Sequence, residues 1–144
     1  MEVCHPFGTD DFIINFLSRN VKDYEETYQR MIDNSDETNV GACFSLSRLC
    51  MATRWPYLYR VIAPRLWKKS TTDAKGAEQT LEDIIDDSTI ELAIHQANIT
   101  MYRKSLTKPE LKLARERAGL RLKNGGLGIH LCSHMANAAY VGAW

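Results

Sequence analysis

The chain has 144 residues, of which 44% are hydrophobic and 25% are charged, and its formal net charge is zero. These values are ordinary for a globular domain with a real core. No apolar run reaches the roughly 18 residues of a transmembrane helix, and residues 1–8 lack the pattern of a signal peptide. We therefore expect an intracellular protein of the cytoplasm or nucleus, with no membrane partner.

Charge is arranged in alternating blocks along the chain. The net charge is −6 over residues 1–41, +6 over 42–70, −6 over 71–95 and +6 over 96–144. Folding could gather the basic blocks into one basic face despite the neutral total. The alternative is that the blocks neutralise one another across a solvated surface, which composition by itself favours.

The first predicted helix spans residues 10–33. Thr9 suits the N-cap, and Asp10 and Asp11 put negative charge at the positive end of the helix dipole. Apolar side chains recur every three to five residues and predict one buried stripe of Phe12, Phe16, Val21, Tyr24, Tyr28 and Met31.

A second predicted helix spans residues 38–55. It should end at Trp55, because the residue before a proline, here Pro56, is disfavoured in the α conformation. A short helix over 57–62 is then closed by Pro64. After a loop, a fourth helix bends near its Asp-Asp-Ser sequence and carries an apolar face of Leu81, Ile84, Ile85 and Leu92.

The C-terminal part begins with a helix start, in which Thr107 caps and Glu110 completes a capping box. Three glycines within residues 125–128 predict positive φ angles or close backbone contacts, so valine at Gly126 should destabilise the fold. Residues 133–144 predict a packed helix. The expected class is all-α, an irregular bundle of about five helices with this glycine-rich turn. The predicted core comprises Phe12, Phe16, Tyr24, Tyr28, Phe44, Tyr57, Leu58, Leu81, Ile84, Leu127 and Tyr140.

Three stretches, in this order, resemble the region after the palm in LINE-type (non-LTR) retrotransposon reverse transcriptases. They are residues 6–13 (PFGTDDFI), 54–64 (RWPYLYRVIAP), and 120–129 (LRLKNGGLGI) followed by 138–144 (AAYVGAW). The chain departs from the family pattern at Arg121, where proline is usual, and at His130 and Leu131, where arginine and serine are usual.

The resemblance implies a thumb-like helical domain over residues 1–104 and a truncated connection-like segment over 105–144. Such a fragment of an RNA-directed DNA polymerase would support an RNA/DNA template–primer duplex beside a palm domain that is missing here. The family's catalytic aspartates and Mg²⁺ belong to that palm. Asp10 and Asp11 open a helix, so we interpret them as capping acids. We expect no catalytic residue, no cofactor and no enzymatic activity in this chain alone.

The basic block at 42–70 supplies the candidate nucleic-acid contacts. Its cations could neutralise phosphates, while Trp55, Tyr57 and Tyr59 pack against sugars or hold the thumb together. The alternative is a solvated basic surface. The candidate binding residues are Arg48, Arg54, Arg60, Arg65, Lys68 and Lys69.

Two other patterns concern metal binding and cysteine chemistry. His130-x-Cys132-x-His134 lacks a fourth ligand and predicts no metal site. The four cysteines form no CxxC pair and are expected to be free, mostly buried thiols. The second hypothesis for the whole chain is a small helical protein-interaction module, a domesticated or decayed retroelement remnant.

Overall fold

The computed structural model describes residues 8–72, 76–100 and 107–143. Cys4, and the first two residues of the stretch 6–13, lie outside this range. The described chain is helical, as the sequence predicted, apart from a two-stranded antiparallel hairpin that pairs Ser70 with Thr80. None of the helices in the described ranges combines the length and apolar character needed to cross a membrane.

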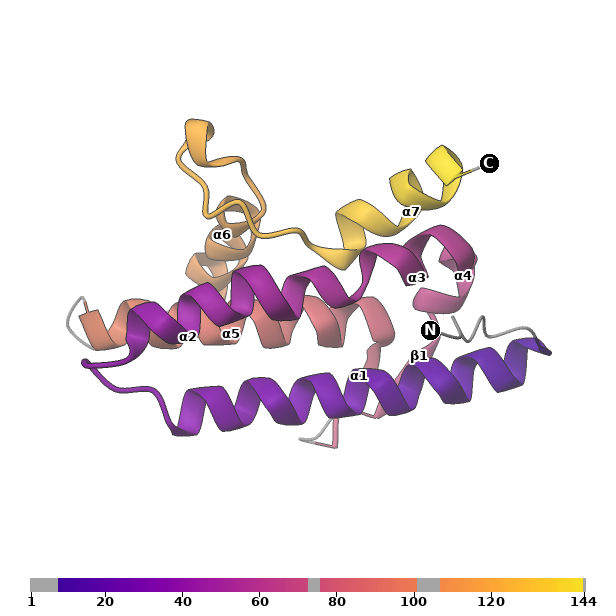
Figure 1. Ribbon diagram of the computed structural model, residues 1–144, viewed down its shortest axis with the longest axis horizontal. Helices are drawn as coiled ribbons and strands as arrows, with labels where there is room; N and C mark the ends of the chain where they lie inside the picture. Colours follow the sequence, from indigo (N-terminus) through magenta and orange to yellow (C-terminus); the bar gives the residue numbers. More distant parts are fainter. Residues whose placement is uncertain (1–7, 73–75, 101–106, 144) are drawn as a thin grey trace.

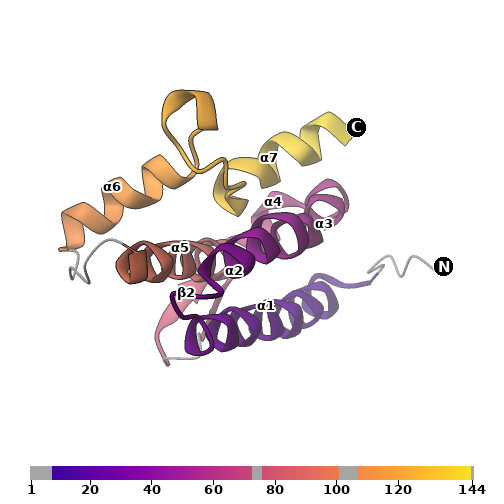
Figure 2. The ribbon, with the colours of Figure 1, turned by 60° about the vertical axis from the view of Figure 1, so that its left-hand side comes forward.

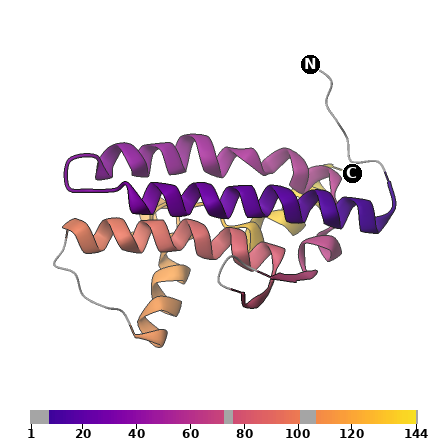
Figure 3. The same cartoon turned by 90° about the horizontal axis from the view of Figure 1, so that it is seen from below.

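The order of elements is shown in Figure 1. The elements are α1 (Asp10–Asp33), α2 (Val40–Leu46), η1 (Ser47–Met51), η2 (Ala52–Arg54), α3 (Pro56–Val61), α4 (Pro64–Trp67), β1 (Ser70–Thr72), β2 (Glu78–Thr80), α5 (Leu81–Thr100), α6 (Lys108–Ala118), η3 (Leu122–Asn124) and α7 (Cys132–Ala143). Helices α1, α2 and α5 run alongside one another, and α5 contacts both of the others (Figure 3).

Helix α1 has the predicted bounds, and the Thr9 side chain accepts a hydrogen bond from the Phe12 backbone N–H. Its buried face consists of Leu17, Val21, Tyr24 and Tyr28. Phe12, predicted to be in the core, is 54% exposed. Ile13, Ile14 and Phe16 pack partly against the core instead, and Leu17 is the first fully buried residue of the helix.

Prolines separate the short helices and also begin the next ones. As predicted, one helix ends before Pro56 and the next ends before Pro64. The conformation predicted for Trp55 is wrong, because it keeps helical angles (φ −94°, ψ −27°). Pro56 and Pro64 also occupy the first turns of α3 and α4. The first turn of a helix does not need the N–H that proline lacks.

An aromatic cluster joins these short helices to α1. Trp67 is fully buried, and its ring meets those of Trp55 and Tyr59 edge-on, with centroids 6.0 and 5.1 Å away. Tyr24 extends the cluster with a centroid 5.1 Å from Trp55. Tyr57, predicted to be buried, points to solvent instead. Tyr57 and Tyr59 are two residues apart on α3, so they point to different sides of the helix and only Tyr59 faces the core.

Hydroxyl groups connect α1, η1 and α5 inside this core. The Tyr28 hydroxyl lies 2.8 Å from Ser47 Oγ in η1 and accepts a hydrogen bond from the Tyr24 hydroxyl at 3.2 Å. Tyr24 also lies 3.2 Å from Thr89 Oγ1 in α5. Ser47 sits in a π-helical turn that widens the predicted second helix. A single π turn of this kind changes which side chains face the core.

Asp86 anchors the C-terminal part of the chain. Its carboxylate, only 1% exposed, accepts hydrogen bonds from the backbone N–H groups of Cys132 (2.6 Å) and Ser133 (3.2 Å) and from Ser133 Oγ (2.6 Å). These groups form the N-terminus of α7, where the helix dipole favours negative charge. The predicted bend near residues 86–88 is wrong, since α5 continues through them. Asp86 is a cap for a helix 46 residues away.

Arg115 attaches α6 to the same acidic cluster. Its guanidinium lies 3.1 Å from Asp83, 3.0 Å from Asp87 and 3.6 Å from Asp86. Burial raises the pKa of the Asp87 carboxyl, and the Arg115 charge opposes that rise. The predicted capping box at Thr107 and Glu110 is present at the other end of α6.

The glycine turn follows α6 and is built as predicted, with positive φ at Gly125 (78°) and Gly128 (65°). Gly126 is required for another reason than the one predicted. Its φ is not positive, but any β-carbon there would overlap the backbone carbonyl of Leu120. Leu127, predicted to be in the core, lies exposed on this turn.

We predict that Gly126→Val destabilises the protein by about 1–3 kcal/mol, because the backbone around Leu120 must move to admit the side chain. Urea denaturation followed by circular dichroism measures the change. Gly41→Ala is the matched control, since its β-carbon meets nothing within 4 Å and it lies in a helix. Equal stability of the wild type and Gly126→Val would contradict the close approach.

We predict that Asp86→Ala destabilises the protein by about 3 kcal/mol, because it leaves the α7 N-terminus and Arg115 without their buried acceptor. Thermal denaturation provides the measurement. Asp23→Ala removes an exposed partner of Arg54 and should cost less than about 1 kcal/mol. If the two variants have the same melting temperature, Asp86 does not anchor α6 and α7.

Candidate nucleic-acid interface

Two segments without any acidic residue meet on one side of the molecule. Residues 42–70 and 117–144 contain no aspartate and no glutamate. Helices α3 and α4 of the first segment pack against α7 of the second. A β-carbon at Gly128 would lie 3.6 Å from Arg48 Nη2, so the glycine turn also reaches the first segment. We call this side of the molecule the acid-free face.

The acidic blocks lie together elsewhere. Helix α1 packs against α5, which begins with Glu82 and Asp83. In Figures 1 and 2, α1 lies at the bottom of the molecule, while α6, the glycine turn and α7 lie at the top. Helix α1 and the C-terminal segment therefore lie on opposite sides of the molecule (Figure 1). Acidic helix α5 contacts both, and its Asp83, Asp86 and Asp87 pair with Arg115 of α6.

Three of the six predicted binding residues face the acidic helices. Arg54 forms an ion pair with Asp23 of α1 at 3.3 Å, and Arg65 forms one with Asp10 at 2.8 Å. Burial raises the pKa of Glu82, and the nearby charge of Lys68 opposes this rise. These cations are already partly neutralised, so they are weaker candidates for phosphate contact than the sequence suggested.

The other three predicted residues, Arg48, Arg60 and Lys69, are exposed. None of them forms an ion pair with a residue in the described ranges. They belong to the acid-free segment, and Arg48 also reaches the glycine turn. These three retain the charge that a phosphate contact needs.

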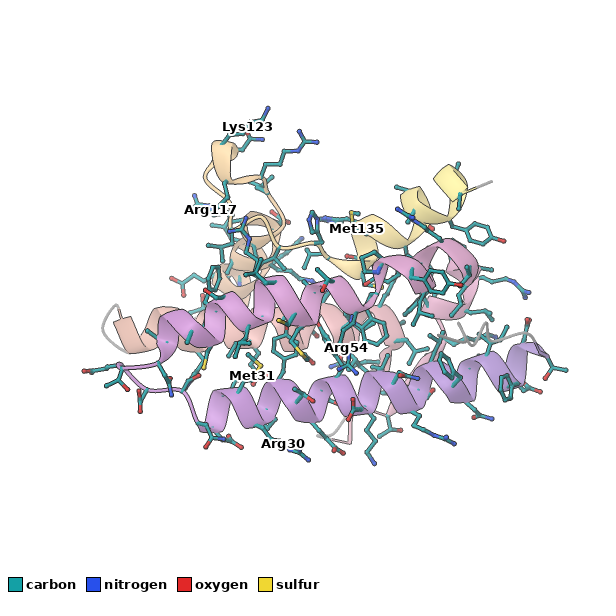
Figure 4. All side chains as sticks on the ribbon, in the orientation of Figure 1. Arg30, Met31, Arg54, Arg117, Lys123 and Met135 are labelled. Atoms are coloured by element: carbon teal, nitrogen blue, oxygen red, sulfur yellow. The ribbon has the colours of Figure 1, made fainter. Side chains whose placement is uncertain are left out.

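Sequence reasoning missed three cations of the C-terminal segment. Arg117, Arg121 and Lys123 are exposed and have no ion pair among the described residues. Figure 4 shows Arg117 and Lys123 on the part of the molecule that projects above α2. The charge of +6 over residues 96–144 was a signal for them, but nothing in the sequence placed the glycine turn beside Arg48.

Most aromatic residues of the basic block at 42–70 pack in the core. Trp55 and Tyr59 are buried in the aromatic cluster, so they hold the helices together and cannot reach a sugar. Tyr57 is the member of this group that reaches solvent.

The side chains of His130, Cys132 and His134 do not form a common site. Both histidines are exposed, whereas Cys132 is buried, and the described residues contain no group of side chains that could hold a metal ion. Cys43, Cys50 and Cys132 are free thiols, as predicted, but Cys50 is exposed and Cys43 half-buried. Burial raises the pKa of the Cys132 thiol, and the negative charge of Asp86 adds to the rise.

Comparison with models of protein families, with curated proteins and with solved structures finds no match for this chain. The resemblance to reverse transcriptases therefore rests on the three stretches of sequence, and it remains a prediction. The candidate site is the acid-free face, whose segments carry six exposed cations without an ion pair to any described residue.

We predict that Cys132 resists alkylation by iodoacetamide in the native protein at pH 8, because its raised pKa keeps the thiol protonated and burial excludes the reagent. Cys50 is exposed and serves as the internal standard. Peptide mass spectrometry should find Cys132 modified only when urea unfolds the chain. Modification of both thiols at similar rates in buffer would contradict this burial.

Proposed function

We propose that this chain is the thumb and connection part of a LINE-type reverse transcriptase and that it supports the template–primer duplex. The proposal combines the order of the three resembling stretches with one structural observation. Two of these stretches, 54–64 and 120–129, lie in the acid-free segments that fold onto one side. The chemistry of nucleotide addition, with its Mg²⁺, belongs to a palm domain outside this chain, and the protein works in the cytoplasm or nucleus.

The acid-free face suits a nucleic-acid backbone for electrostatic reasons. Each cation that contacts a phosphate releases condensed counterions, so affinity rises as salt falls. The two acid-free segments carry six exposed cations, Arg48, Arg60, Lys69, Arg117, Arg121 and Lys123, of which Arg48 lies beside the glycine turn and Lys69 beside the start of α5. Phosphate contacts of this kind carry no sequence information, and a polymerase must accept any template.

The second candidate is a protein-interaction module, and one observation favours it. Leu46 and Leu49 on α2 and η1 are solvent-exposed, Leu49 to 69%. Exposed aliphatic side chains of this kind are common at protein interfaces. A reading frame upstream of Met1 that encodes an aromatic-x-Asp-Asp palm hairpin would favour the polymerase fragment. An independent promoter and start codon before Met1 would favour the module.

We predict that the double variant Arg48→Ala/Arg60→Ala binds an RNA/DNA primer–template more weakly than the wild type and lowers the slope of log K against log salt by about two. Fluorescence anisotropy over a salt series measures both quantities. Arg54→Ala should change them less, because Asp23 already pairs with this arginine.

Arg30→Ala is the control, since Arg30 lies on α1 at the opposite edge of the molecule (Figure 4). Thermal denaturation verifies that each variant folds. If the double variant and Arg30→Ala bind with the same affinity and salt slope, the acid-free face does not hold the duplex and the proposed function fails.

A further inference from the structure

The glycine turn presents an apolar side chain between two cations. Leu122 is 58% exposed, and Arg121 and Lys123 on either side of it are exposed too. Figure 4 shows Lys123 at the end of the part that projects from the helical body. We propose that this turn enters the minor groove of the bound duplex, with Leu122 as an apolar wedge and its two neighbours on the flanking phosphates. The inference rests on the proposed function.

Backbone hydrogen bonds hold the turn in one conformation. The backbone N–H groups of Asn124 and Gly126 both donate to the Arg121 carbonyl, at 2.8 and 3.2 Å. Gly128 donates to the Leu120 carbonyl at 2.9 Å, and Gly126 packs directly against the same peptide unit. A backbone already held in this way loses less conformational entropy on binding, which favours affinity.

The charge around this turn suits a polyanion such as a nucleic acid. Leu122 lies next to Gly128, and Arg48 Nη2 approaches the same glycine from the helical body. Cations therefore approach the wedge from three positions, with no acid anywhere between Arg117 and Ala143. Apolar side chains flanked by arginine and lysine are the means by which minor-groove proteins unstack a base step.

The shape of the turn also selects the groove. A duplex that contains RNA has a deep, narrow major groove and a wide, shallow minor groove. The single 3₁₀ turn of η3, Leu122–Asn124, is short and projects from the body, so it suits the shallow groove. An α-helix would be the usual reader of a major groove.

The test uses an RNA/DNA primer–template that carries 2-aminopurine, whose fluorescence rises when a base step unstacks. Wild-type protein should increase this fluorescence. Leu122→Ala should bind about tenfold more weakly, with an unchanged salt slope and no fluorescence increase. Arg121→Ala and Lys123→Ala should each lower the salt slope by about one.

Leu113→Ala is the matched control, because Leu113 is a leucine of α6 that is 49% exposed and lies outside both acid-free segments. It should bind and unstack like the wild type. If Leu122→Ala behaves like Leu113→Ala while Arg48→Ala/Arg60→Ala still weakens binding, the wedge is overturned and the proposed function stands.

Two other outcomes are equally decisive. Displacement of the duplex by polyglutamate at matched charge concentration, together with a loss of polyglutamate binding in Leu122→Ala, would assign the turn to an acidic protein partner and overturn the wedge. No binding of the primer–template by the folded wild-type chain at low salt would overturn the proposed function itself.

Discussion

The buried carboxylate of Asp86 is the interaction on which the arrangement of this protein depends. An ionised carboxylate inside a protein must receive hydrogen bonds or an opposite charge, because it has left water. Asp86 receives two backbone N–H groups and a hydroxyl from the start of α7, and the charge of Arg115 from α6. One side chain of α5 therefore holds both helices that flank the glycine turn.

This anchor determines where the charges of the chain lie. With α7 fixed on α5, the acid-free C-terminal segment packs on α3 and α4, whose own segment also lacks acids. Cations that gather without neutralising partners repel one another, which makes the fold less stable than a mixed surface would be. The proposed contact with a nucleic acid would offset this cost. The projecting turn with Leu122 adds an apolar contact to this field.

The core of the helical body holds the elements of the acid-free face in place. The hydroxyls of Tyr24, Tyr28, Ser47 and Thr89 form a buried network across α1, η1 and α5. Burial raises the pKa of Tyr24, so this hydroxyl remains a neutral donor at physiological pH. Networks of satisfied polar groups favour one packing arrangement over its alternatives. The π turn at η1, which carries Arg48, is therefore held in a defined position relative to the core.

Signals that act within a few residues were readable from the sequence. They include the bounds and cap of α1, the capping box at Thr107 and the special backbone of the glycine turn, since each depends on neighbouring atoms of the chain. The tertiary structure alone decided that Phe12, Tyr57 and Leu127 face solvent and that Asp86 is buried. It also decided that Arg54 pairs with Asp23, whereas Arg48 forms no ion pair with the part of the chain that the structure describes. Burial and pairing depend on partners that lie tens of residues away, and the periodicity of one helix does not show which of its neighbours will cover it.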